Sequence, residues 1–487
     1  MLPVPSLKNM MEYDMSIEAV NDKKYNRLKK EKKFEKKKSV STTKIIVLGF
    51  LLVIIVGTVL LSLPISAVNG KVDVLTALFT ATTSVCVTGL VVVDTFSYWT
   101  LFGKVVILIL IQIGGMGIIA IICGMMLVLH KKVNLKERMI IQDAYNLNNL
   151  QGVIRFVKKI IIGTFTVELI GALLYMVVFI PEFGLAKGIW FSIFTSISAF
   201  CNAGIDIIGP SSLIPYQSSP LVLITTMMLI FNSGIGFVVW WDVLDIFKRV
   251  IKKEIRLRDF ISKLSIHSRL VLSVTFALIF TGATLIFIFE CKNEGTIGNM
   301  NVCDKILNSL FQSITLRTAG FASFNQGELE GSSVLVCIVL MLIGGSPVGT
   351  AGGVKTVTVA VLIFAVVAVV KGRNEAIVFN RSINQGLIRK SLAVVLISLV
   401  AFVLLSLLLM ITNDFSMDDS LFEVASAIAT VGLTRGITSE LNTVGRLIII
   451  VGMYLGRIGP ISMFIAFSNK YSIKNSIHYA EAELIVG

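Results

Sequence analysis

The chain has 487 residues, of which 55% are hydrophobic and only 15% charged, and its mean hydropathy is +0.85. This composition lies outside the range of soluble globular proteins and indicates an integral membrane protein. The net charge of +14 would suit a nucleic-acid-binding protein. However, the basic residues cluster in a few segments, as they do in membrane proteins, so we expect a lipid bilayer and no nucleic acid as partner.

The first 42 residues are polar and rich in lysine. They lack the apolar core and the small-residue cleavage site of a secretory signal. We expect residues 1–42 to form a basic cytoplasmic arm that lies on anionic lipid, and docking of a dedicated partner is the alternative.

Eight apolar runs follow, each near or above the roughly 20 residues that cross a bilayer. They pair two by two along the chain: 43–63 and 104–130, 159–180 and 221–247, 269–290 and 333–371, 390–412 and 444–468. The prediction is an all-α integral membrane protein with eight spanning helices.

The distribution of charge predicts the orientation. Of the 44 Lys and Arg residues, 34 fall in the N-terminal segment up to Lys44, in segments 131–159, 248–269 and 371–390, and after residue 469. These segments are expected in the cytoplasm, with both termini inside a cell membrane. The intervening outer segments are neutral or acidic, which favours cations at the outer mouth. Their acidic residues are Asp94, Asp206, Glu290, Glu294, Asp414, Asp418, Asp419 and Glu440.

Between the two runs of each pair lies a short segment of one repeated design. Each has a glycine, a Ser or Thr six residues earlier (five in the third copy), and a Phe ten residues earlier (nine in the third). The glycines, spaced 115, 116 and 112 residues apart, are Gly89, Gly204, Gly320 and Gly432. A fourfold repeat of helix, re-entrant loop and helix around one pore explains this period.

Each such segment is too short to span the membrane and must return as non-helical backbone. Backbone of that kind is tolerated at membrane depth only where it lines water or protein, so its carbonyl oxygens are expected to face a pore. These oxygens would replace the hydration shell of K⁺, and glycine permits the backbone angles required. One such glycine would be weak support, because glycine is common in membrane helices, but four in register favour a selectivity filter over packing alone. The predicted filter residues, with K⁺ at the four glycines, are Val87, Thr88, Gly89, Asn202, Ala203, Gly204, Thr318, Ala319, Gly320, Thr430, Val431 and Gly432.

These segments resemble the Trk/Ktr/HKT superfamily of K⁺ transporters over residues 43–487. The resemblance rests on Thr88-Gly89-Leu90, Asn202-Ala203-Gly204, Arg317-Thr318-Ala319-Gly320-Phe321, Glu423 with Ser426, and Thr430-Val431-Gly432-Leu433. It implies four M1-P-M2 units (helix, pore loop, helix) in pseudo-fourfold arrangement. The departures, which spare every filter glycine, are Cys86, Cys201, Ile205 and a long basic arm.

The resemblance also implies function and partners. It implies K⁺ uptake through a gated pore, with Na⁺ as a possible coupling ion, by a homodimer in which each subunit has its own pore. A separate cytoplasmic ring of the KtrA or KtrC type would bind the nucleotide, and no cofactor is expected in this chain. The predicted division is a basic arm (1–42), four repeats (43–130, 131–247, 248–371 and 372–468) and a cytoplasmic tail (469–487).

Two basic residues, Lys355 and Arg457, are the only ones of 44 predicted inside spanning helices. A charge there is costly and usually functional. Lys355 follows the segment 344–353, whose five glycines and one proline cannot continue a helix. This break resembles the intramembrane gating loop of the superfamily, beside which its members place an arginine. The predicted gate residues are Gly344, Gly345, Ser346, Gly349, Thr350, Gly352, Gly353, Lys355 and Arg457. The alternative is that both charges pair with buried acids such as Glu168.

Other polar residues carry smaller expectations. Glu168, which lies in an otherwise apolar run, is predicted to be a structural hydrogen-bond or ion-pair partner rather than a transport carboxylate. Arg317 is predicted to brace the filter rather than to bind an ion. Gln112 and Asn232 are expected to join helices, and Cys291 and Cys303 are either bridged or free. The six cysteines and three histidines form no metal-ligand pattern.

The sequence therefore favours a monovalent-cation translocator over an enzyme, since no nucleophile with its base and no nucleotide loop is present. The main alternatives within transport are a Trk-type or other K⁺/Na⁺ subunit, and an alternating-access transporter of inverted repeats. The latter is disfavoured because all four repeats share one orientation and only one long helix, 333–371, is expected to be broken. A non-transporting scaffold would not need four glycine segments in register.

Overall fold

The computed structural model describes residues 42–128, 138–139, 141–142, 152–459 and 463. Within them the chain is mostly helical, and its single sheet is a hairpin of β1 (Ile377–Val378) and β2 (Arg381–Ser382). The predicted arm, apart from Thr42, and the predicted tail lie outside these residues.

Four helices of the described chain are individually long and apolar enough to cross a bilayer. They are α2 (Thr42–Leu61), α8 (Val153–Phe183), α13 (Ile266–Glu290) and α17 (Gln385–Thr412). Each covers the first apolar run of a predicted repeat. Many of their Leu, Ile and Val side chains are exposed in the isolated chain, as expected for surfaces that contact lipid.

Each of these helices is followed by a shorter, mostly buried one. The short helices are α3 (Val74–Cys86), α9 (Leu185–Cys201), α14 (Val302–Thr315) and α18 (Met417–Ala429). Polar caps start three of them, because the side chains of Asp73, Asn301 and Ser416 accept hydrogen bonds from backbone N–H groups of the first turn. Each short helix packs against the long helix before it. The phenylalanines of the repeated segment, Phe79, Phe194, Phe311 and Phe422, are fully buried in the core.

The second apolar run of every repeat is interrupted or ends at a glycine-containing segment. The helices are α5 (Leu101–Met116) and α6 (Ile118–Val128), α10 (Pro220–Gly234) and α11 (Phe237–Ile251), α15 (Gly331–Leu342) and α16 (Thr356–Val370), and α19 (Thr443–Ile458). Gly117, Gly236 and Gly459 have φ between 82° and 88°. Between α10 and α11 the helix direction bends by 102°. The expectation of a single broken helix is therefore wrong, because the other glycine runs also end regular helix.

The broken second helices also affect the count of spans. By length and composition the described chain has four spanning helices, or five if the bent pair α10–α11 is one span. The eight-span arrangement of four M1-P-M2 units thus stays a prediction.

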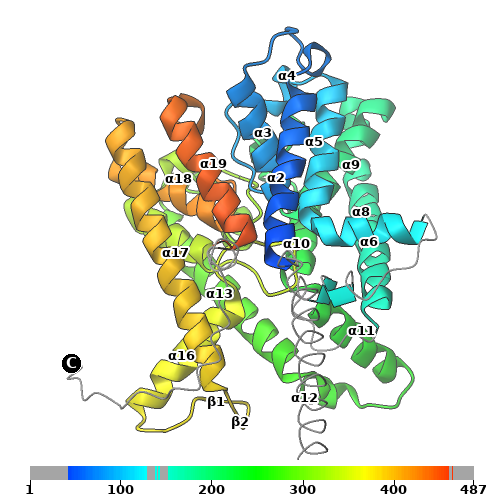
Figure 1. The fold of residues 1–487 in the computed structure, drawn as a ribbon, viewed down its shortest axis with the longest axis vertical. Helices are drawn as coiled ribbons and strands as arrows, with labels where there is room; N and C mark the ends of the chain where they lie inside the picture. The colour runs from blue at the N-terminus through cyan, green and yellow to red at the C-terminus, as the bar shows by residue number, and fades with distance from the viewer. Residues whose placement is uncertain (1–41, 129–137, 140, 143–151, 460–462, 464–487) are drawn as a thin grey trace, which may run out of the picture.

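The two ends of the molecule differ in the segments that they carry (Figure 1). The short helix α4 (Thr95–Tyr98) lies at one end, and α12 (Phe260–Lys263) and the β1–β2 hairpin lie at the other. The basic segments 248–269 and 371–390, which contain α12 and the hairpin, thus share one end, in keeping with their predicted location on one side of the membrane.

Candidate functional site

The chain turns sharply after each of the four short helices. The residues two before the filter glycines all have left-handed backbone angles, with φ of 56° at Val87, 59° at Asn202, 76° at Thr318 and 54° at Thr430. The predicted filter glycines follow with φ between 62° and 100°. Left-handed angles are unfavourable for Val and Thr, so the surrounding structure must hold these segments in place. The four segments, called the filter strands below although they belong to no sheet, are residues 87–89, 202–204, 318–320 and 430–432.

The Ser or Thr of each repeated segment provides part of that support. Thr83 and Ser426 accept hydrogen bonds from the backbone N–H groups of Gly89 and Gly432, each at 2.9 Å. In the other two repeats, the hydroxyl donates instead to the carbonyl oxygen of the residue after the glycine. These pairs are Ser198 with Ile205 at 2.5 Å and Thr315 with Phe321 at 2.8 Å. The hydroxyl spacing seen in the sequence therefore corresponds to one brace per strand.

The four glycines approach one another as a closed ring. A Cβ atom added to any of them would lie closer than 3.0 Å to a backbone carbonyl oxygen of the next repeat, a separation that real Cβ atoms essentially never show. The pairs are Gly89 with Ala203, Gly204 with Ala319, Gly320 with Val431, and Gly432 with Thr88. The repeats thus follow one another around the ring in chain order, and both backbone angle and space require glycine.

The surroundings of this ring favour positive charge. Three of the short helices end directly before their strands, and the carboxyl end of a helix carries partial negative charge. A cavity of about 220 Å³ opens beyond the ring and is lined by all four glycines and by Asp94 and Asp206. Burial raises the pKa of Asp206 to about 7, although hydrogen bonds from Ser212 and from backbone N–H groups partly oppose the shift.

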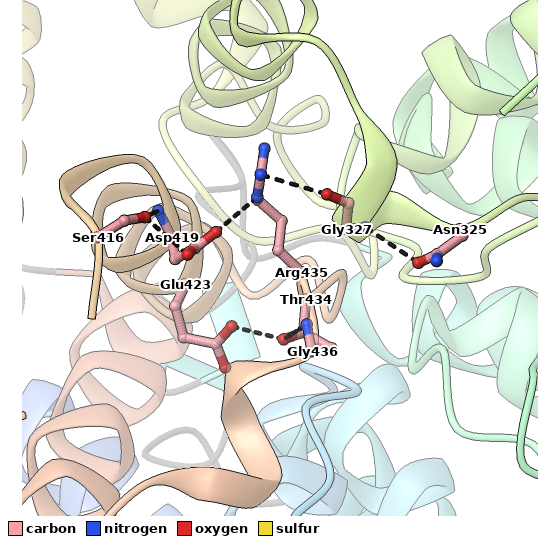
Figure 2. A network of polar contacts seen from close by, with 8 residues as sticks. All are labelled: Asn325, Gly327, Ser416, Asp419, Glu423, Thr434, Arg435 and Gly436. Carbon is pink, nitrogen blue, oxygen red and sulfur yellow. Dashed lines mark hydrogen bonds and ion pairs between the residues drawn. The ribbon is translucent and has the colours of Figure 1, made fainter. Parts of the chain in front are cut away.

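A polar network holds the loop that follows the fourth strand (Figure 2). The Glu423 carboxylate accepts a hydrogen bond from the Thr434 hydroxyl at 2.7 Å. It accepts another from the Thr438 hydroxyl, which is not drawn. Arg435 forms an ion pair with Asp419 at 2.7 Å. The same guanidinium donates to the carbonyl oxygen of Gly327 in the third repeat at 3.3 Å. The network therefore joins the loops that follow the third and fourth glycine segments.

The predicted gate segment 344–353 is non-helical and docks on the break between α10 and α11. The N–H of Ser346 donates to the carbonyl oxygen of Gly234 at 2.9 Å, and the N–H of Phe237 donates to that of Val348 at 3.0 Å. Backbone groups released by the two broken helices thus satisfy each other, as membrane-depth backbone must.

Arg457 lies beside this segment, as expected. Its guanidinium donates hydrogen bonds to the carbonyl oxygens of Thr350 in the loop and of Gly114 at the end of α5, and a longer one of 3.4 Å to Gly115. The prediction of Lys355 inside a spanning helix is wrong, because Lys355 is the N-cap residue of α16. Its ammonium donates a hydrogen bond to the Ala351 carbonyl oxygen. The glycines before it end the helix earlier than hydropathy indicates.

The remaining candidates are structural by their contacts. Gln112 donates to the Glu168 carboxylate at 3.1 Å and thereby joins α5 to α8, as expected. Asn232 instead donates to the Met228 carbonyl one turn earlier in α10, so among the described residues it joins no other helix and its predicted joining role is wrong. Arg317, buried behind the third strand, donates to Thr275 of α13 at 3.5 Å.

The cysteines of the third repeat are not bridged, and no metal-binding cluster accompanies them in the described residues. Cys291 and Cys303 are free thiols. In the part of the chain that the structure describes, no group of three or more His, Cys, Asp or Glu residues is placed to hold a metal ion.

The acceptors supplied by the first two repeats were not expected from the sequence. These are the carbonyls of Gly114, Gly115, Ser233 and Gly234, which bind Arg457 or the loop. The signal that points to them is the pair of glycine-rich stretches 114–117 and 233–236 near the centre of apolar runs.

Comparisons with known proteins identify similar chains over nearly the whole length. The profile of the TrkH family, described as "Cation transport protein", matches residues 9–479. The chain is 39% identical to the Ktr system potassium uptake protein B of Bacillus subtilis, over 91% of this chain and 96% of that protein. It is 35% identical to the potassium/sodium uptake protein NtpJ of Enterococcus hirae, over 93% and 98% respectively.

A solved structure shares the fold. The potassium transporter TrkH from Vibrio parahaemolyticus superposes with a TM-score of 0.69 over 89% of this chain and 86% of that one, at 16% identity.

Proposed function

This chain belongs to the TrkH family of cation transport proteins, within the Trk/Ktr superfamily, and from that membership we propose that it is a KtrB-like subunit that carries K⁺ into the cell through a gated pore. The observation that carries the proposal is the ring of four glycines. At each of them the backbone is left-handed and a carbonyl oxygen of the next repeat lies where a side chain would begin. Carbonyl oxygens arranged in this way are the ligands that replace the water of a dehydrating K⁺.

The proposed ion path runs from the outer cavity through the ring to the 344–353 loop. Asp94 and Asp206 raise the local concentration of cations in the cavity. The carbonyls of Thr88, Ala203, Ala319 and Val431 bind the ion. Each repeat contributes one short strand in place of a full TVGYG sequence, so we expect weaker discrimination of K⁺ over Na⁺ than in a K⁺ channel.

The loop 344–353 is the proposed gate, and Arg457 holds it in the closed position through a hydrogen bond to its backbone. A charge-assisted hydrogen bond to a loop carbonyl stabilises the closed arrangement more than a neutral one would. The gate is proposed to face the cytoplasm, where a nucleotide-binding ring of the KtrA or KtrC type would control it. We further propose a homodimer in the cell membrane with both termini inside.

One relative favours a second candidate. The Enterococcus hirae protein is named for potassium and sodium, so this chain is alternatively a K⁺/Na⁺ subunit in which Na⁺ is transported or required. Several broken helices are compatible with alternating access, but closure of the ring by four glycine segments supports a continuous pore.

Growth of a K⁺-uptake-deficient bacterium at low external K⁺ tests the proposal. Expression of the full chain, with its regulatory ring, is expected to restore growth. The same assay with and without Na⁺ separates Na⁺-dependent from Na⁺-independent uptake. Failure to restore growth by a chain that reaches the membrane would contradict the proposal, and flux that saturates as in a carrier would favour alternating access.

A further inference from the structure

One side chain of the second filter strand, Asn202, is hydrogen-bonded to the intramembrane loop. Its Nδ2 donates to the Thr350 hydroxyl at 3.1 Å, and its Oδ1 accepts from the Ser233 hydroxyl at 3.1 Å. The Thr350 hydroxyl also donates to the carbonyl oxygen of Phe200 at 3.4 Å. Asn202, Ser233 and Thr350 are each only 1% exposed. A predicted filter residue is therefore clamped between the loop and the end of α10.

This contact is specific to the second strand. The residues equivalent to Asn202 in the other three strands are Val87, Thr318 and Thr430. Valine has no polar side-chain atom, and the hydroxyls of the two threonines are buried without a hydrogen-bond partner. The loop does approach the fourth strand, because a Cβ at Gly352 would collide with the Thr430 side chain. Of these four described residues, Asn202 is thus the one with a side-chain hydrogen bond to the loop.

The clamp affects backbone that is under strain. Asn202 has a φ of 59° and is the C-cap residue of α9. It directly precedes Ala203, whose carbonyl oxygen belongs to the ring. A buried amide that loses one of its partners is unfavourable, so removal of the Thr350 hydroxyl would allow Asn202 to move in search of another. Movement there changes the spacing of the carbonyls on the inner side of the strand.

We propose that the Thr350 hydroxyl, acting through Asn202, is a determinant of K⁺ over Na⁺ discrimination as well as a part of the gate. The proposal rests on the proposed K⁺ transport function and adds a selectivity role to a loop residue. While the hydroxyl is in place, the second strand is held at the spacing that suits K⁺. Once the contact is lost, the strand closes more easily around the smaller Na⁺.

Four single variants of the full chain in liposomes test the proposal. Thr350→Val removes the hydroxyl at nearly constant volume and keeps the carbonyl that binds Arg457. Thr350→Ser keeps the hydroxyl. Ser233→Ala loosens Asn202 from its other side without a change in the loop. Ser346→Ala is the matched control, since the Ser346 hydroxyl pairs with Thr356 at 3.0 Å in the same loop.

The measurements are the KM for K⁺ and the inhibition of K⁺ uptake by Na⁺. Thr350→Val and Ser233→Ala are expected to lower the preference for K⁺ over Na⁺ by about fivefold or more, as the loss of a buried hydrogen bond implies. Thr350→Ser should stay near wild type, and Ser346→Ala should change only the maximal rate. The Thr350→Val/Ser233→Ala double variant should show less than the sum of the two effects, because both act on one amide.

Unchanged ion preference in Thr350→Val or Ser233→Ala would overturn the inference. An equal change in Ser346→Ala would overturn it as well, because general loosening of the loop would then be the cause. If Thr350→Val fails to fold, Ser233→Ala decides the question. Absence of K⁺ flux in the wild-type protein would instead overturn the proposed function itself.

Discussion

The guanidinium of Arg457 donates a hydrogen bond to the carbonyl oxygen of Thr350, 107 residues earlier in the chain. Because the same guanidinium also binds the carbonyl of Gly114, a single side chain in α19 connects the loop of the third repeat to the broken helix of the first. A fastening of this kind should stabilise the closed loop without contact with the ring of glycines.

Replacement of Arg457 tests this fastening. Arg457→Ala is expected to raise the maximal rate of K⁺ uptake by about tenfold, because charge-assisted hydrogen bonds to the loop are lost. Arg457→Lys should restore closure only in part, since an ammonium lacks the forked geometry of the guanidinium. Arg446→Ala is the matched control in the same helix, where the guanidinium binds the nearby Leu441 carbonyl. Normal gating in Arg457→Ala would contradict the assignment.

Shortening of the loop tests the gate from the other side. Deletion within 344–353 is expected to raise K⁺ flux and to make it less dependent on the regulatory ring, because it removes a barrier from the pore. Combined with Arg457→Ala it should add little, since both changes remove one interaction. Strict additivity, or loss of flux in a folded dimeric protein, would show that the gate lies elsewhere.

The hydroxyl brace of the fourth strand is open to a controlled test within one helix. Ser426→Ala removes the acceptor of the Gly432 N–H and is expected to raise the KM for K⁺ by about three- to tenfold. Ser420→Ala in the same helix should have little effect, because the buried Ser420 hydroxyl has no hydrogen-bond partner. Equal KM values for the two variants would remove the role of the brace.

Transport should depend on pH through Asp206. With its pKa raised to about 7 by burial, this carboxylate is charged above pH 7 and becomes neutral as the pH falls below it. Asp94, which lines the same cavity, pushes this pKa in the same direction. The KM for K⁺ should therefore rise as the external pH is lowered from 8 to 6, because the cavity loses negative charge. Asp206→Asn should raise the KM for K⁺ at high pH and abolish most of its pH dependence. An unaltered pH profile in this variant would contradict the role of Asp206.

Much of the site follows from sequence because its rules are local. The Phe, the hydroxyl and the glycine recur at fixed spacing, since each strand needs a buried anchor, a brace and a residue free to adopt left-handed angles. The breaks at Gly117 and Gly236 are not evident from the sequence, because apolar residues continue across them and the backbone angles rather than the composition end the helices. The partners of Arg457 and the Thr350 partner of Asn202 lie in other repeats, and such pairings depend on tertiary packing that spacing does not encode.

The KM for K⁺ of Gly89→Ser, Gly204→Ser, Gly320→Ser and Gly432→Ser tests the central claim most directly. Each substitution places a side chain against a carbonyl of the ring, so variants that reach the membrane should show a raised KM and should admit Na⁺. Gly184→Ser is the control for backbone strain alone, because Gly184 has a φ of 81°, close to the 83° of Gly320, but no atom within 4 Å of the added Cβ. The account predicts a normal KM in this control and a raised one in the four ring variants. An unchanged KM for K⁺ in all four well-expressed ring variants would contradict it.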